Sequence, residues 1–307
     1  MAPLCPSFDG LCIKCNASND GNDANSEQMG EFWGWGPLNP SREENFDIIR
    51  NLFTEIHQVF PDNYIHLGGD EVPDNCWFND PEVATWAEEK GFTSNTEIQQ
   101  YYMKRIYDIC NEIGFKYIVW DEVFSDSDVD PDADLPVEEK PTVHLWFPWE
   151  NPQVPHGWEP TMKKVVSTGH HAILSSTWYL DIIERPNDNH DGYDWSRYYK
   201  TDPREFISDY EPLTEEEKLL VDGGVGCYWS EYVDTTGFLP RTFPRISSIA
   251  EKLWSKFEDT QDIEDALPRI DQFRCRLISR GIPAEPAVVP SSCAKEYDVK
   301  YRPPWEQ

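Results

Sequence analysis

His66-Leu67-Gly68-Gly69-Asp70-Glu71 follows the apolar pair Tyr64-Ile65, and this stretch decides how the rest of the chain is interpreted. Apolar residues leading into two glycines predict a buried strand at its carboxyl end, where backbone can approach a ligand closely. Asp and Glu are unfavourable inside a strand, so this pair predicts an active-site mouth in a β/α fold. Neighbours on a regular strand point to opposite faces, so both carboxylates can face one substrate only if the chain turns at the glycines. The alternative is a solvated acidic loop.

The residues on either side alternate between strand-like and helix-like patterns. Short apolar runs predict strands at Tyr64–Gly68, Tyr117–Trp120, Val143–Trp146, Ala172–Ser175 and Val225–Trp229. Helical periodicity predicts a helix capped by Ser41, and further helices at 81–90, 95–113, 159–167, 214–221, 240–255 and 261–280. The repeated order predicts an α/β fold with a parallel sheet covered by helices. The long segments 122–141 and 181–213 are expected to be binding loops.

Composition limits the class of protein. The 307 residues suffice for one large or two ordinary domains, and 39% hydrophobic residues can supply a core. With 26 Lys and Arg against 57 Asp and Glu, the net charge is −31, which argues against nucleic acid as a partner. No run approaches the roughly 18 apolar residues of a membrane span. Residues 1–6 have neither the basic nor the apolar part of a signal peptide.

The eight cysteines favour a few structural disulfides over a metal site. Cys12-x-x-Cys15 has redox or zinc spacing, but no second pair completes a zinc site, so a loop disulfide is expected there. Cys76 is expected to tether the N-terminal loop through Cys5, Cys12 or Cys15. Cys110 and Cys227 are predicted to be buried thiols. No pair of histidines has metal-ligand spacing, and no metal or cofactor is expected.

Three regions are predicted along the chain: a Cys-containing N-terminal loop region over 1–41, an α/β domain over 42–285, and a tail over 286–307. The sequon Asn16-Ala17-Ser18 in the first region, together with disulfides, favours the secretory pathway. His66 and His144 are expected in the strand core. Asp121 and Glu122 end a strand, where a site-lining role and a supporting ion-pair role are equally open.

Several segments resemble the family 20 glycoside hydrolases, the β-N-acetylhexosaminidases. Besides residues 66–71, they are Tyr117–Phe124, Leu174–Asp181, Gly226–Asp234, and Pro244-Arg245 through Ala250–Trp254. They occur in this order over most of the chain and are most similar to the lysosomal or secreted animal enzymes. The resemblance also implies that Cys275 and Cys293 pair.

The resemblance implies a (β/α)₈ TIM barrel of which this chain holds the fourth to eighth strands. A closed barrel needs eight strands, and five leave two unpaired edges. The family's first-strand Arg, which grips sugar hydroxyls, and an Asp and a His before the fourth strand have no counterpart here. We therefore expect a fragment of a larger enzyme that is weakly active or inactive alone.

The implied activity is retaining hydrolysis of terminal β-linked GlcNAc or GalNAc, in which the substrate's own 2-acetamido oxygen attacks the anomeric carbon. Glu71 is the general acid and then the base. Asp70 orients the acetamido N–H and stabilises positive charge. Two adjacent carboxylates in a partly buried mouth cannot both ionise easily, and we predict that the pKa of Glu71 is the raised one.

Aromatic residues are the expected walls of the sugar site. A single Trp at a strand end is usually core, but Trp120, Trp146 and Trp229 stand at three equivalent ends, which favours sugar contact. The resemblance makes them walls, and Trp178 is also assigned to substrate binding. It further implies that Tyr179 bonds the acetamido oxygen.

Two acidic residues complete the expected set, because the resemblance implies that Asp181 and Glu231 hold sugar hydroxyls. An acidic Asp181 predicts a preference for neutral over 6-sulfated sugars. The alternative function is a truncated, non-catalytic family member that keeps part of a sugar-binding face. Expected partners are hexosamine-terminated glycans and a possible homo- or heterodimer, in a lysosomal or secreted parent protein.

Overall fold

The computed structural model describes residues 4–14, 36–72, 76–125, 135–136, 139–147, 157–181, 194–230, 233–288 and 291–293. The chain divides into two compact units, the N-terminal unit Met1–Val143 and the C-terminal unit His144–Gln307. The Asn16 sequon and Glu231 lie outside the described residues. Among the described residues, no helix combines the length and the apolar character that a bilayer span requires.

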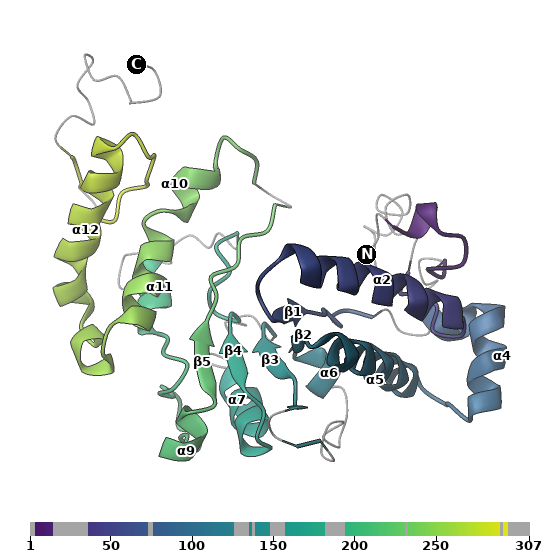
Figure 1. The fold of residues 1–307 in the computed structure, drawn as a ribbon. Coiled ribbons are helices and arrows are strands. Elements are labelled where there is room, and N and C mark those ends of the chain that lie inside the picture. Colours follow the sequence, from purple (N-terminus) through teal and green to yellow (C-terminus); the bar gives the residue numbers. More distant parts are fainter. Residues whose placement is uncertain are drawn as a thin grey trace. The chain divides into compact units, whose positions relative to one another are not determined.

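The strands of the described chain form a parallel sheet in the order β1-β2-β3-β4-β5 (Figure 1). They are β1 Tyr64–His66, β2 Lys116–Trp120, β3 Thr142–Leu145, β4 Ala172–Leu174 and β5 Val221–Gly224. β1 pairs with β2 so that His66 lies opposite Ile118, and β4 pairs with β5 so that Leu174 lies opposite Gly224. A sheet in chain order, with a helix between successive strands, is the βαβ arrangement that the sequence predicted.

The helices of the N-terminal unit begin and end where their capping residues dictate. They are η1 Cys5–Ser7, α2 Glu43–Val59, α3 Cys76–Asn79, α4 Pro81–Lys90, α5 Asn95–Ile113 and α6 Glu122–Ser125. The Asp80 side chain caps α4, and Gly91 ends it with φ +79°. Ser94 and Glu97 form a capping box at the start of α5, and Gly114 ends that helix with φ +101°. These signals explain why the predicted ranges 81–90 and 95–113 match.

The core of the N-terminal unit lies between these helices and the β1–β2 pair. α5 lies beside α2 (Figure 1) and packs against β2. Tyr107 of α5 stacks on Tyr117 of β2, with ring centroids 4.5 Å apart. A second buried cluster joins α3, α4 and α5 and includes Trp77, Val83 and Ile98. α5 therefore has two buried faces and fixes the turn that follows β1.

The helices of the C-terminal unit form two groups. They are α7 Trp158–Ser167, α8 Asp194–Lys200, α9 Glu215–Lys218, α10 Phe238–Thr242, α11 Arg245–Trp254, η3 Phe257–Thr260 and α12 Ile263–Ser279. In one group α7 packs against β4 and α9, and the other is made of the helices around α8 and α11. α8 contacts both α11 and α12. Trp195 and Tyr199 of α8 share a buried cluster with Ile270 of α12 and with Ala287. α8 is therefore the central helix of this unit's core.

Several predicted elements differ from the observed ones. β5 is Val221–Gly224, and not Val225–Trp229, because Gly223 and Gly224 pair with Ile173 and Leu174 inside the sheet. The helix expected over 214–221 ends at Lys218, where this strand is about to begin. The helix expected over 240–255 is two, α10 and α11, separated at Phe243-Pro244.

Other differences concern caps and exposure. Ser41 does not cap α2, since its hydroxyl bonds Asn39 Oδ1 at 2.6 Å. β1 is not a buried strand, because it is the first strand in the sheet order and two of its three residues are exposed. His66 is one of them, which corrects its expected place in the core, whereas His144 is buried. The helix α8 lies within the segment expected to be a loop.

The disulfides confirm part of the cysteine prediction. Cys275 bonds Cys293, as the resemblance implied. Cys12 forms a loop disulfide, as expected, and its partner, which the sequence left open, is Cys5. Cys76 is disulfide-bonded as well, and neither Cys5 nor Cys12 is its partner. Cys110 is a buried free thiol, whereas the free thiol of Cys227 belongs to a half-buried residue.

Candidate functional site

The turn after β1 has an unusual backbone. Gly68 and Gly69 have φ of +74° and +101°, and Glu71 has φ +46°. Glu71 is the one non-glycine residue with positive φ in the described part of the chain. Such a conformation costs on the order of 1 kcal/mol and is typical of functional sites. The turn required by the adjacent carboxylates is therefore present, although no contact of the described residues fixes the direction of either side chain.

Helices hold this turn from behind. A Cβ added to Gly69 would lie 2.2 Å from Cγ2 of Val123 in α6, so only glycine permits this approach. The Gln99 side chain of α5 donates from Nε2 to the Gly69 carbonyl at 2.8 Å. The Gly68 carbonyl accepts from the Trp120 N–H at 3.0 Å, which extends the β1–β2 pairing. Backbone geometry and three neighbouring elements, α5, α6 and β2, thus fix the backbone position of Asp70 and Glu71.

His66 and Trp120 form the aromatic part of this site. Their ring centroids lie 4.6 Å apart, and His66 Nδ1 accepts from the Gly68 N–H at 3.1 Å. Although the residue is exposed, packing around the ring lowers the pKa of His66, and the negative charge of Asp70 opposes this shift. A lowered pKa favours the neutral ring, which suits the acceptor role of Nδ1.

Asp70 and Glu71 are both exposed in the N-terminal unit. The sequence analysis placed them in a partly buried mouth, and that burial is absent from the described structure of this unit. Among the described strands β1 is the first in the sheet order, and no described strand pairs with its outer edge. The predicted rise in the pKa of Glu71 depended on this burial and stays a prediction.

In the C-terminal unit, three of the expected sugar-binding residues, Trp178, Tyr179 and Asp181, lie on one segment that follows β4. Tyr179 bridges to Cys227 in parallel register. The Cys227 N–H donates to the Trp178 carbonyl at 2.9 Å, and the Leu180 N–H donates to the Cys227 carbonyl at 2.7 Å. The segment 178–180 is thus paired with the chain that follows β5, one strand further along the sheet.

Trp178 lies inside the unit. It is fully buried, and a Cβ on Gly224 would lie 1.9 Å from its ring atom Cζ3. Its indole N–H donates to the Tyr198 carbonyl at 3.1 Å. The Tyr198 hydroxyl donates to the Tyr179 carbonyl at 3.2 Å. One residue of α8 therefore holds both Trp178 and Tyr179, and Trp178 exposes no ring face in this structure.

Tyr179 is surrounded by other candidate residues. Its ring lies 6.3 Å from that of Trp146, which is half-buried at the end of β3. The thiol of Cys227 lies between the side chains of Ser175, Tyr179 and Asp181. Burial raises the pKa of this thiol, and the Asp181 charge adds to the rise, while hydrogen bonds from Ser175 and Tyr179 oppose it. These contacts make a compact polar group beside two aromatic rings.

Asp181 and Trp229 complete this group. Asp181 Oδ1 accepts from the Trp229 N–H at 3.2 Å, so the carboxylate is fixed at the start of the chain beyond Cys227. The Trp229 side chain is 48% exposed. The C-terminal unit therefore brings together Trp146, Tyr179, Asp181 and Trp229.

Three supporting residues escaped the sequence analysis. Gln99 lies in a long polar helix face that offered no signal. Tyr198 is in the segment taken for a loop, although Trp195, Tyr198 and Tyr199 at helical spacing were a usable signal. Cys227 was taken for core alone. Asp121 is 2% exposed, which favours its supporting role. No group of metal-ligating side chains occurs among the described residues.

Comparison with known proteins places this geometry in a family. Residues 13–257 match the model of the glycosyl hydrolase family 20 catalytic domain. The chain is 36% identical to the mouse β-hexosaminidase subunit alpha over 95% of its own length and 49% of that protein. It is 37% identical to the human β-hexosaminidase subunit beta over 82% of its length and 41% of that protein.

Solved structures agree with this match. The fold superposes on the chitobiase of Flavobacterium johnsoniae with a TM-score of 0.64 and 27% identity, covering 80% of this chain and 34% of that one. A β-N-acetylglucosaminidase from Vibrio harveyi in complex with N-acetylglucosamine has a TM-score of 0.63 at 21% identity, over 81% of this chain and 37% of that one. This chain spans about half the length of the curated relatives it matches.

The parallel strands described above are therefore part of a (β/α)₈ barrel, and the segments at their carboxyl ends are of the kind from which barrel active sites are built. Both the family model and the curated relatives cover most of the chain. The chain belongs to the glycosyl hydrolase family 20.

Proposed function

We propose that this chain supplies the acid/base and acetamido-binding residues of a β-N-acetylhexosaminidase that cleaves terminal β-linked GlcNAc or GalNAc with retention. The observation that carries the proposal is the turn that ends in Glu71, a carboxylate at positive φ beside Asp70 at the end of a parallel strand. A residue held in such a backbone needs support from its surroundings, and Gln99 and Val123 supply it.

In the proposed reaction Glu71 gives its proton to the glycosidic oxygen as that bond breaks. The substrate's acetamido oxygen forms a bond to the anomeric carbon and gives a cyclic oxazoline-type intermediate, a route in which the substrate replaces the protein nucleophile. Asp70 accepts a hydrogen bond from the acetamido N–H and stabilises the positive charge of the ring as it forms. Glu71 then takes a proton from water, which opens the ring with retained configuration.

The C-terminal unit supplies all but one of the proposed binding residues, and the N-terminal unit supplies the other, Trp120. Tyr179 donates to the acetamido oxygen, and Trp120, Trp146 and Trp229 form apolar walls. Trp178, whose ring is buried, contributes to binding by anchoring the segment that carries Tyr179. Asp181 and Glu231 accept sugar hydroxyls. The bond from the Trp229 N–H supports a fixed Asp181 carboxylate. A fixed negative charge repels sulfate, so a neutral substrate should be cleaved faster than its 6-sulfated analogue. Asp181→Asn should reduce this difference between the two cleavage rates.

The test is hydrolysis of a fluorogenic β-GlcNAc substrate at mildly acidic pH by the purified chain. Glu71→Gln and Asp70→Asn should each lower kcat by at least about a hundredfold, the scale of general acid–base catalysis. Glu88→Gln on the exposed face of α4 is the matched control and should leave the rate unchanged. Equal rates for wild type and Glu71→Gln would remove Glu71 from the mechanism.

The second candidate is a non-catalytic sugar-binding member, favoured by the exposure of Asp70 and Glu71 in this chain. It predicts binding of N-acetylglucosamine without turnover. The names of the curated relatives as alpha and beta subunits support assembly with another chain. Activity per molecule that rises with protein concentration would favour the enzyme completed by association.

We also propose a lysosomal or secreted location for the parent protein, in line with its disulfides.

A further inference from the structure

The two sulfurs of the Cys275–Cys293 disulfide have different surroundings. Cys275 lies in α12 and is partly exposed, whereas Cys293, eighteen residues later, is 6% exposed. An external thiol reaches a disulfide through the more accessible sulfur. Access alone therefore favours attack at Cys275.

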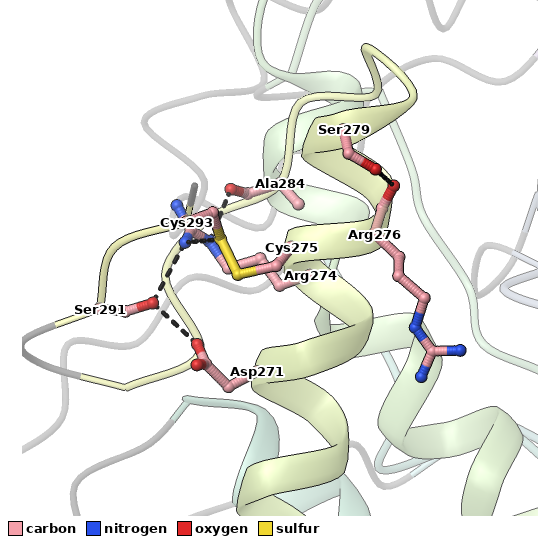
Figure 2. The surroundings of a disulfide bond; sticks show 8 residues. All are labelled: Asp271, Arg274, Cys275, Arg276, Ser279, Ala284, Ser291 and Cys293. Carbon is pink, nitrogen blue, oxygen red and sulfur yellow. Dashed lines mark hydrogen bonds between the residues drawn. A yellow bond between two sulfur atoms is a disulfide. The ribbon is translucent and has the colours of Figure 1, made fainter. Parts of the chain in front are cut away.

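The buried guanidinium of Arg274 contacts the other sulfur, that of Cys293 (Figure 2). Arg274 is 1% exposed, and its Nη1 donates to Cys293 Sγ at 3.0 Å. The same nitrogen donates to Ser291 Oγ at 3.1 Å, and Nε donates to the Ala284 carbonyl at 3.2 Å. The Ser291 hydroxyl in turn donates to Asp271 Oδ1 at 2.7 Å. We call these five residues, Asp271, Arg274, Cys275, Ser291 and Cys293, the C-terminal clasp.

The charge of Arg274 and the exposure of Cys275 favour the same direction of attack on the Cys275–Cys293 disulfide. A guanidinium beside a sulfur stabilises the thiolate form of that sulfur. In thiol–disulfide exchange, a sulfur that is more stable as a thiolate is the better leaving group. Arg274 therefore makes Cys293 the leaving sulfur, and Cys275 is the sulfur that a nucleophile can reach.

We propose that the C-terminal clasp is a directional thiol-exchange site that takes small thiols of the glutathione class on Cys275. The incoming thiolate sulfur forms a bond to Cys275 Sγ as the Cys275–Cys293 bond breaks. The electron pair of that bond passes to Cys293 Sγ, which leaves as a thiolate beside Arg274. The thiol is oxidised to a mixed disulfide and Cys293 is reduced, so no further oxidant is needed.

Opening the clasp has a path to the candidate binding segment within the same unit. The Trp195 indole donates to the Ala287 carbonyl at 2.8 Å, in the stretch that the disulfide closes. Trp195 belongs to α8, and Tyr198 of that helix bonds Trp178 and Tyr179. Loss of the cross-link weakens the hold of residues 284–288 on α8, and through it the hold on residues 178–180.

The Cys5–Cys12 disulfide is an internal control. Both of its cysteines are buried, at 2% and 6% exposure, so it offers no partly exposed sulfur for attack. The proposal predicts that millimolar glutathione opens the C-terminal clasp before this bond in the folded chain.

The experiment incubates the folded full chain with reduced glutathione at neutral pH, quenches with acid, alkylates the freed thiol and maps both products by peptide mass spectrometry. The expected result is glutathione on Cys275 and the alkyl group on Cys293. Glutathione on Cys293, an even distribution, or a clasp that opens no faster than Cys5–Cys12 would overturn the proposal. This readout needs no hydrolytic activity, so it stands apart from the proposed function.

Two variants test the role of Arg274. Arg274→Gln removes the charge and should slow opening about fivefold, because the Cys293 thiolate then leaves without a cation beside it. Arg274→Lys keeps the charge and should stay closer to the wild-type rate. Thermal unfolding shows whether each variant folds, and if Arg274→Gln does not, the position of glutathione in the wild-type chain still decides the question. Equal rates for Arg274→Gln and wild type in folded proteins would exclude Arg274 as the cause.

Discussion

The two groups of candidate residues are held in different ways. In the N-terminal unit, Asp70 and Glu71 lie on an exposed turn fixed by backbone conformation, with three positive φ angles in four residues. In the C-terminal unit, Trp178 and Tyr179 are at most 7% exposed and are fixed by strand pairing and by Tyr198. The proposed acid group depends on glycine and the proposed binding group on buried aromatic packing.

This contrast suits the proposed chemistry. A proton donor has to be reached by a leaving group and by water, which an exposed turn at a strand end allows. An acetamido-binding residue has to be fixed precisely, because its contacts determine where the sugar lies. The contrast predicts that substitutions that alter the backbone affect Asp70 and Glu71 most. Substitutions that alter side-chain packing should affect Trp178 and Tyr179 most.

The largest expected effect is that of Gly69→Ala. A Cβ there meets Val123 Cγ2 at 2.2 Å and sits at φ +101°, so strain and overlap combine to cost about 3 kcal/mol in the free energy of unfolding. Urea denaturation measures it. Gly91→Ala, at φ +79° with nothing within 4 Å of the added carbon, isolates the strain and should cost about 1 kcal/mol.

Val123→Ala separates the two causes of the Gly69→Ala effect. In the double variant the overlap is gone, so the added cost of Gly69→Ala should fall to that of Gly91→Ala. A double-mutant cycle with no coupling between the two positions would mean that the turn does not depend on its approach to α6.

The next effect is that of Gly224→Ala in the C-terminal unit. The added carbon would meet the Trp178 ring at 1.9 Å and the Leu174 carbonyl at 2.7 Å, and a strand carbonyl cannot move away easily. We expect a loss of about 2 kcal/mol, with a changed near-ultraviolet spectrum of the buried indole. Gly226→Ala is the control, since its nearest atom is the flexible end of Ile246, and its cost should be smaller. Equal costs would weaken the claim that packing fixes Trp178.

A smaller effect is expected for Tyr198→Phe. It removes the hydroxyl that donates to the Tyr179 carbonyl, at a cost of about 1 kcal/mol. Tyr199→Phe removes a neighbouring hydroxyl that bonds Glu251 Oε1, so a similar loss of stability is expected there. Hydrogen exchange distinguishes them: the Leu180 amide should exchange faster in Tyr198→Phe alone. Similar exchange in both variants would mean that Tyr198 stabilises the unit without positioning the segment.

The sequence predicted the parallel α/β fold and the turn at Gly68-Gly69, because glycine, capping residues and apolar runs act locally. The caps of α4 and α5 are of this kind, and their helices were predicted to the residue. Exposure was not predicted for β1, since an apolar strand is buried only if neighbours cover both sides of it. The position of β5 was missed because Gly224 is explained by Trp178, which is far from it in the sequence.

The site divides in the same way. The sequence alone reveals the adjacent carboxylates after a strand and the tryptophans at strand ends. The resemblance to the family supplied their proposed roles. Tyr198 and Gln99 act through contacts with residues 19 and 30 positions away, and such contacts leave no pattern in a single sequence. The supporting residues of a site therefore need the structure, even where its reactive residues do not.

The smallest effect expected concerns His66, whose ring lies near the proposed acid group and tests where the Asp70 carboxylate points. Packing lowers the pKa of this ring below that of the unfolded chain, and Asp70 opposes the shift. Because the folded state then binds the proton more weakly, stability is lost as the pH falls through the unfolded pKa of about 6.5. The loss should be small, since the residue is partly exposed and solvent screens it. An NMR titration of the His66 ring should give a pKa below the ordinary value, and Asp70→Asn should lower it further by removing the favourable charge. An unchanged pKa in that variant would mean that the Asp70 carboxylate points away from His66 into solvent, and a pKa above the ordinary value would mean that packing does not exclude water from the ring.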